Sequence, residues 1–164
     1  MPNQNAIIVA MTVAGLTSSF MFMLVIPIQA DLPALLNASR ADTAWVVTST
    51  LLAAAIIAPI SGRLGDMYGK RRIVLILLAA MILGSVLAAL SSSLLLVVIG
   101  RTLQGAMTGV IPLGIAILRD TLHQNRVDTA IALNSATMGI GGAIGMPLSA
   151  YVAQIGDWHL LFWM

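Results

Sequence analysis

One arginine lies inside an otherwise apolar stretch of the chain. Arg101 is the single charged residue between residues 73 and 118, about seven residues, or roughly 10 Å, inside a helix expected to begin at Leu94. At that depth in a membrane, a charge is costly unless it faces a polar cavity or a partner. Gln104 follows at i+3 and shares its helix face. Two interpretations are open: the guanidinium faces a polar cavity, or it snorkels outward to the nearer interface.

A second polar group lies at residues 62–72, and it combines three glycines with five charges. The segment is Gly62-Arg63-Leu64-Gly65-Asp66-Met67-Tyr68-Gly69-Lys70-Arg71-Arg72. The glycines allow two helix ends to approach through a tight turn. A generic basic loop accounts for the cations but not for Asp66. We expect Asp66 to pair with Lys70 or Arg71, or to meet a helix N-terminus.

A third pattern is a row of small residues near the end of the chain. Gly141, Gly145 and Ser149 recur every four residues, with Pro147 among them. This spacing places small side chains on one helix face and permits close packing against another helix in lipid. The pattern therefore predicts a helix-packing face.

Enzyme chemistry has little support in this sequence. Cysteine is absent, which excludes disulfides, thiolate zinc sites and a cysteine nucleophile. His123 and His159 are expected on opposite faces of the membrane and cannot share a metal. The usual hydrolase and nucleotide-binding motifs are missing. We expect that the chain is not an enzyme and binds no metal or cofactor. We expect an ion gradient to supply the energy for its function.

Composition identifies the class of protein. Of 164 residues, 59% are hydrophobic and 9% are charged, whereas soluble domains are about a quarter charged. The formal net charge is +2, and eight basic residues cannot form a stripe that binds nucleic acid. This composition also argues against a soluble domain and a disordered segment. The sequence predicts an all-α integral membrane protein in a lipid bilayer.

Uncharged stretches predict five membrane-spanning helices and the start of a sixth. Because a span needs about 20 apolar residues, we place them at residues 6–28, 43–61, 73–90, 94–118, 129–155 and 158–164. Three serines at 91–93 supply the turn between the third and fourth spans. Since no basic residue precedes Arg40, the first stretch is expected to be a retained span and not a cleaved signal peptide.

The basic residues predict the orientation. Six of the eight fall in two loops on one side of the predicted membrane, at Arg63, Lys70, Arg71, Arg72, Arg119 and Arg126. By the positive-inside rule these loops are cytoplasmic. The amino terminus is then cytoplasmic, and the segments at 31–42, 91–93 and 156–157 face outward across the plasma membrane.

The segment 62–72 matches the pattern G-x-L-(G/A)-D-x-x-G-(R/K)-(R/K), and here the chain resembles the major facilitator superfamily, over about residues 6–164. The resemblance implies a cytoplasmic gating loop, a latch between two six-helix halves. Asp66 and Lys70 would take its charged roles, with Asp120 beside them. The implied loop positions are Gly62, Leu64, Gly65, Asp66, Gly69, Lys70 and Arg71.

The spacing R-x-x-Q-G at Arg101, Gln104 and Gly105 resembles a fourth-span motif of the same family. The resemblance implies that Arg101 faces the central cavity and takes part in substrate or proton coupling. The spans contain no carboxylate, so a titrating acid would be Asp31, near the outer surface, or would lie in sequence beyond this chain. Asp31 is otherwise a solvated loop acid.

The fifth span resembles a glycine-proline motif of drug-exporting members, with Met146 at the usual proline position and Pro147 one residue late. The resemblance implies multidrug efflux: export of small drug-like or amphipathic compounds by alternating access, with protons as the coupling ion. It also implies that residues 1–164 are an incomplete amino-terminal half of the transporter, whose carboxy-terminal half is missing. We expect no transport by these residues alone.

An alternative from another class is a stand-alone small helical membrane protein that docks on a partner. Its docking surface would be the small-residue face at Gly141, Gly145 and Ser149.

Overall fold

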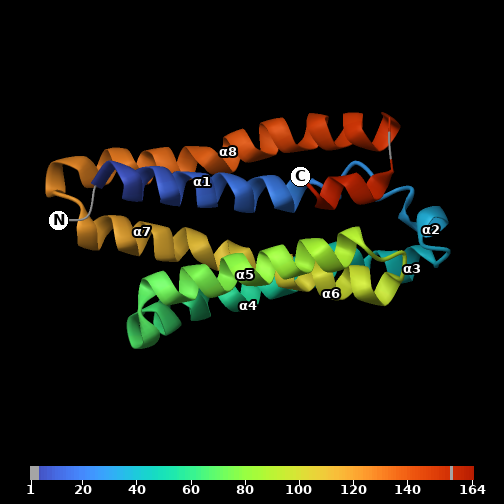
Figure 1. Cartoon of the computed structure of the whole chain (residues 1–164), viewed down its shortest axis with the longest axis horizontal. Helices are drawn as coiled ribbons and strands as arrows, with labels where there is room; N and C mark the ends of the chain where they lie inside the picture. The colour runs from blue at the N-terminus through green and yellow to red at the C-terminus, as the bar shows by residue number, and fades with distance from the viewer. Residues whose placement is uncertain (1–3, 156) are drawn as a thin grey trace.

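The computed structural model describes residues 4–155 and 157–164, and within them the regular elements are all helices that form an elongated bundle (Figure 1). Five helical segments are long and apolar enough to cross a membrane: Gln4–Met23, Arg40–Tyr68, Lys70–Ala89, Leu94–Thr121 and Gln124–Gln154. This finding confirms the predicted all-α architecture with five spans.

The first span is helical over a shorter range than 6–28. Helix α1 is Gln4–Met23, and residues 24–31 follow as a series of turns. Pro27 has no backbone N–H to donate to the Met23 carbonyl, and its ring disfavours a helical conformation at Ile26. The Ile26 N–H bonds to the Met23 carbonyl instead, at 3.2 Å. Leu24 and Val25 are nevertheless buried, so the turns stay packed in the bundle.

The expected polar loop at 62–72 is almost entirely helical. Two short helices, α2 (Leu32–Leu35) and α3 (Arg40–Thr43), lead into α4 (Trp45–Tyr68), and α5 (Lys70–Ala89) begins after one residue. That residue is Gly69, whose φ of 95° is accessible to glycine at little cost. The turn is therefore as tight as the glycines predict, but its charges lie on helix ends.

The fourth span is an interrupted helix. It consists of α6 (Leu94–Gly105), the 3-10 turn η1 (Ala106–Gly109) and α7 (Val110–Thr121). Pro112 cannot donate to the carbonyl of Thr108, which removes one helical hydrogen bond at this point. The expected helix over 94–118 thus changes its hydrogen-bonding pattern midway.

The fifth span is the long helix α8 (Gln124–Ile155), and the expected sixth begins as a short 3-10 turn, η2 (Trp158–Phe162). The Asp157 carboxylate caps this turn by accepting a hydrogen bond from the His159 backbone at 3.1 Å. That bond, and then the His159 ring, hold the pKa of Asp157 below its usual range. Gly156, part of the expected break at 156–157, lies outside the described residues.

The bundle has two chemically different ends. The α4–α5 and α7–α8 turns lie with the start of α1 at one end, while α2, α3 and η2 lie at the other (Figure 1). The first end carries the six basic residues of the predicted cytoplasmic loops. On the sides, α5 exposes large apolar residues such as Leu75, Ile76, Ile82 and Leu83, as a lipid-facing helix must.

Glycines bring α5 and α6 into backbone contact. A Cβ built on Gly100 would lie 2.6 Å from the Gly84 carbonyl oxygen, and one built on Gly84 would meet the Gly100 carbonyl. Neither helix can accept a side chain at this crossing without moving. Small residues here substitute for the hydrophobic driving force that helix association lacks in lipid.

We expect Gly100→Ala to lower the free energy of unfolding by about 1–3 kcal/mol, because the new methyl group must separate α5 from α6. Gly139→Ala is the matched control, since a Cβ there meets nothing within 4 Å. Unfolding in detergent micelles, followed by circular dichroism, measures both changes. Equal stability of the two variants would contradict the close α5–α6 contact.

Candidate functional site

The Arg101 side chain is buried inside the bundle, with 1% of its surface exposed. Its Nη1 donates to the Met21 carbonyl at 3.1 Å and to Gln104 Oε1 at 2.8 Å. Met21 lies in the last turn of α1, where carbonyl groups lack partners within the helix. The guanidinium therefore caps the negative end of the α1 dipole, a favourable position for a cation.

Gln104 extends this polar contact from α6 to α5. Its Nε2 donates to Ser85 Oγ at 2.8 Å, while its Oε1 receives the bond from Arg101. A continuous hydrogen-bonded line thus joins α1, α6 and α5 through Met21, Arg101, Gln104 and Ser85. The shared face of Arg101 and Gln104 was expected from their spacing. Ser85 was missed, although it is a lone hydroxyl in an apolar span.

The Arg101 network lacks a counter-charge within the part of the chain described. None of the ion pairs among residues 4–155 and 157–164 involves Arg101, and its buried Nε has no hydrogen-bond partner. The guanidinium points toward α1 and Gln104. A snorkelling arginine would instead point toward an end of the bundle. Its position in a central cavity stays a prediction.

Gly105 has a packing position in this fold. A Cβ there would meet the Thr50 carbonyl of α4 and would lie 3.1 Å from the Ala53 Cβ. The residue therefore sets the distance between α4 and α6, and through it the position of Arg101 relative to the rest of the bundle.

A second candidate site is an ion-pair cluster where α4, α5 and α7 end or begin. Lys70 Nζ lies 2.5 Å from Asp120 Oδ2 and 3.7 Å from Asp66 Oδ1. Of the partners expected for Asp66, the structure shows Lys70. One ammonium group thus connects three helices at the basic end of the bundle.

The other residues expected in the gating loop occupy different environments. Gly65 packs against the Leu113 side chain of α7, and Leu64 packs against the apolar core. Gly62 has open space around it, and Gly69 forms the turn. Arg71 is exposed and lines a mainly apolar cavity of about 550 Å³ between α1, α5 and α7.

The small-residue face of α8 is covered by α1. A Cβ on Gly141 would lie 2.7 Å from Ser19 Cβ, and one on Gly145 would lie 3.2 Å from the Phe20 ring. The buried Ser149 hydroxyl donates to the Leu24 carbonyl. The packing prediction is consistent with these contacts, whereas the docking alternative needs a free face and is wrong on that point.

The α1–α8 seam contains polar residues that the sequence did not single out, and Pro147 lies outside it. Asn134 and Thr137 are buried against Gly15, whose added Cβ would lie 2.8 Å from Thr137 Oγ1. Pro147 is exposed within α8.

The remaining titratable candidates are at the ends of the bundle. Asp31 is exposed and shares a cavity with Asp157 and Trp158. His123 and His159 lie at opposite ends. Over the described ranges, no group of three or more His, Cys, Asp or Glu residues could hold a metal ion.

Five apolar spans, a buried arginine and a basic end define a multi-pass helical membrane protein. A sequence model of the Major Facilitator Superfamily matches residues 8–164. The chain therefore belongs to this superfamily of transporters.

Curated relatives include proteins whose names refer to resistance or to transport. The tetracenomycin C resistance and export protein of Streptomyces glaucescens is 29% identical over 164 residues, which is 99% of this chain and 30% of that protein. The uncharacterized MFS-type transporter YvkA of Bacillus subtilis (strain 168) is 33% identical over 129 residues, 78% of this chain and 29% of the relative. The probable multidrug resistance protein EmrY of Escherichia coli (strain K12) is 33% identical over 128 residues, 77% and 25% respectively. The chain thus spans less than a third of the length of these relatives.

We expect Gln104→Leu to destabilise the chain by about 1–3 kcal/mol, because the Arg101 guanidinium loses an acceptor that water cannot replace. Arg101→Met should leave stability unchanged or higher, since an apolar side chain of similar length removes the buried charge. Unfolding in detergent micelles measures both variants. A larger loss in Arg101→Met than in Gln104→Leu would show that the charge itself stabilises the fold.

Proposed function

We propose that this chain is the amino-terminal part of a secondary active transporter that exports small drug-like or amphipathic compounds in exchange for protons. Membership of the superfamily supports transport, and the names of two relatives concern tetracenomycin C resistance and export and multidrug resistance. Alternating access would expose one substrate site to each side of the membrane in turn.

The observation that carries the proposal is the buried Arg101 network. A charge within the hydrocarbon is expensive, and such residues commonly mark substrate or ion pathways. Among the described residues, the hydrogen-bond partners of this cation are neutral, the Met21 carbonyl and the Gln104 amide. A negative group on the substrate, or an acid of the other half, would be attracted to this buried cation more strongly than to the same cation in water.

Because Arg101 bridges α1 and α6, it is also placed to sense their movement. A shift of α1 along α6 would break the bond to Met21 and free one guanidinium donor. The vacated donor could then take a charged ligand, so that binding and helix movement are linked. In this mechanism Gln104 orients the guanidinium, and Ser85 orients Gln104.

The Lys70 cluster would act as the cytoplasmic gate. Ion pairs on exposed surfaces contribute about 1 kcal/mol or less, so they can exchange partners during a transport cycle. Asp66 and Asp120 would hold Lys70 in one state, and groups of the second half would compete for it in the other. The basic end would then be cytoplasmic, as would the amino terminus, and export would proceed toward the α2–α3 end across the plasma membrane.

The proposal predicts that Arg101→Met, in a whole transporter containing this segment, reduces proton-coupled export by more than about tenfold, a loss of at least about 1.4 kcal/mol of transition-state stabilisation. The assay follows collapse of a pH gradient in inverted vesicles when an amphipathic compound is added. Arg119→Gln, which removes an exposed charge, is the control. Full activity of Arg101→Met at equal protein levels would overturn the coupling role.

We also predict that the 164-residue chain, purified and reconstituted into liposomes, does not transport. A two-half transporter forms its cavity between its halves, so one part would offer no closed pathway. Saturable uptake driven by a pH gradient, absent from protein-free liposomes, would show that these residues are sufficient.

A further inference from the structure

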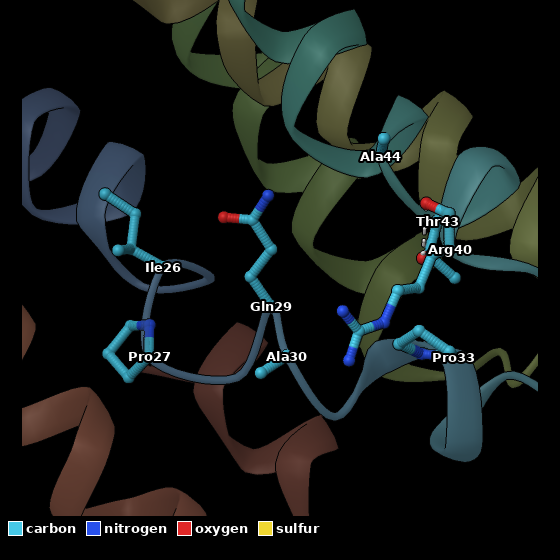
Figure 2. Close-up of a pocket in the computed structure, with 8 residues that line it drawn as sticks. All are labelled: Ile26, Pro27, Gln29, Ala30, Pro33, Arg40, Thr43 and Ala44. Carbon is cyan, nitrogen blue, oxygen red and sulfur yellow. Dashed lines mark hydrogen bonds between the residues drawn. The ribbon is translucent and has the colours of Figure 1, made fainter.

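A hollow of about 400 Å³ opens at the end of the bundle opposite Lys70, between the turns that follow α1 and the start of α4 (Figure 2). Its volume falls within the range of small-molecule sites. Its apolar lining comes from Ile26, Pro27, Ala30, Pro33 and Ala44, and its polar lining from Gln29, Arg40 and Thr43.

Two polar side chains project into this hollow without partners. Figure 2 shows the Gln29 amide and the Arg40 guanidinium extending into the space between the α1–α2 connection and α3. Within the described residues, neither side chain makes a hydrogen bond or an ion pair. Thr43 differs, because its hydroxyl already donates to the Ser39 and Arg40 carbonyls. The hollow thus presents free N–H donors from a guanidinium and an amide.

Neither Asp31 nor Asp42, the two acids that flank lining residues in the sequence, forms an ion pair with Arg40. Asp31 lines a separate cavity with Asp157, and Asp42 accepts a hydrogen bond from the Ser39 hydroxyl at 2.7 Å. Arg40 is the one charged residue among the eight that line the hollow.

We infer that this hollow binds the oxyanion group of an amphipathic organic anion, such as a carboxylate or a phosphate on an apolar body. The guanidinium offers paired N–H donors to such a group, and the Gln29 amide adds a further donor in the same hollow. Proline and aliphatic side chains provide the wall for the apolar body. An anionic lipid has the same chemistry. The site lies within this chain, so binding does not depend on the proposed export.

The test compares two probes with the same apolar body, pyrenebutyrate and pyrenebutylamine, on the 164-residue chain in phosphatidylcholine nanodiscs. Trp45 directly follows the lining residue Ala44, so energy transfer from tryptophan to pyrene reports binding, with empty nanodiscs as the blank. We expect saturable binding of pyrenebutyrate and at least about tenfold weaker binding of the amine. Equal affinity for both probes would overturn the inference.

Variants then locate the site. Arg40→Gln should weaken pyrenebutyrate binding by about tenfold, whereas Arg119→Gln, an equal charge change at the other end, should leave it unchanged. Gln29→Ala, expected to weaken binding by about threefold, serves as the second variant if Arg40→Gln does not fold. Unaltered binding in the folded pocket variants would overturn the assignment.

A last arm separates the two sources of the anion. If the natural occupant is a lipid, phosphatidylglycerol added to the nanodiscs should compete with pyrenebutyrate, and the competition should increase with the anionic lipid content. Binding that is insensitive to this lipid supports a free amphipathic anion. With either source, Arg40→Gln must weaken pyrenebutyrate binding. Unchanged binding in that variant would count against the site.

Discussion

The burial of one guanidinium constrains much of this fold. With 1% of its surface exposed, the Arg101 guanidinium is shielded from water in this structure, so its donors must find acceptors from the protein. The Met21 carbonyl is available because α1 ends two residues later, ahead of Pro27. The early end of helix α1 thus leaves free the carbonyl that Arg101 needs as an acceptor. In turn, this bond fixes α6 against α1, and Gln104 extends the restraint to Ser85 on α5.

Close helix contacts at small residues complete the arrangement. Lipid is as apolar as leucine, so burial of apolar side chains does little to hold membrane helices together. Gly84 and Gly100 allow backbone contact between α5 and α6, and Gly105 does the same for α4 and α6. Gly141 and Gly145 play this part between α8 and α1. The polar network joins α1, α5 and α6, and the glycine contacts connect α4 and α8 to these helices.

The two ends of the bundle differ in chemistry. At one end Lys70 connects carboxylates from α4 and α7 through ion pairs near the surface. At the other end Arg40, which makes no ion pair within the described residues, lines a hollow of mixed polar and apolar character. The structure joins these ends through helices whose sides are apolar, so charge is confined to the ends and to Arg101.

Local sequence determined the number of spans, the basic end and the common face of Arg101 and Gln104, because hydropathy and the helical repeat act over short distances. It also indicated a tight turn near Gly69, and the family pattern named Asp120 as a neighbour of Lys70. Only the tertiary structure decided that Met21 and Ser85 receive this network, that α1 covers Gly141 and Gly145, and that Asn134 and Thr137 are buried. These contacts depend on how each helix is rotated about its axis and crosses its neighbours, and residues far apart in the chain set that geometry jointly.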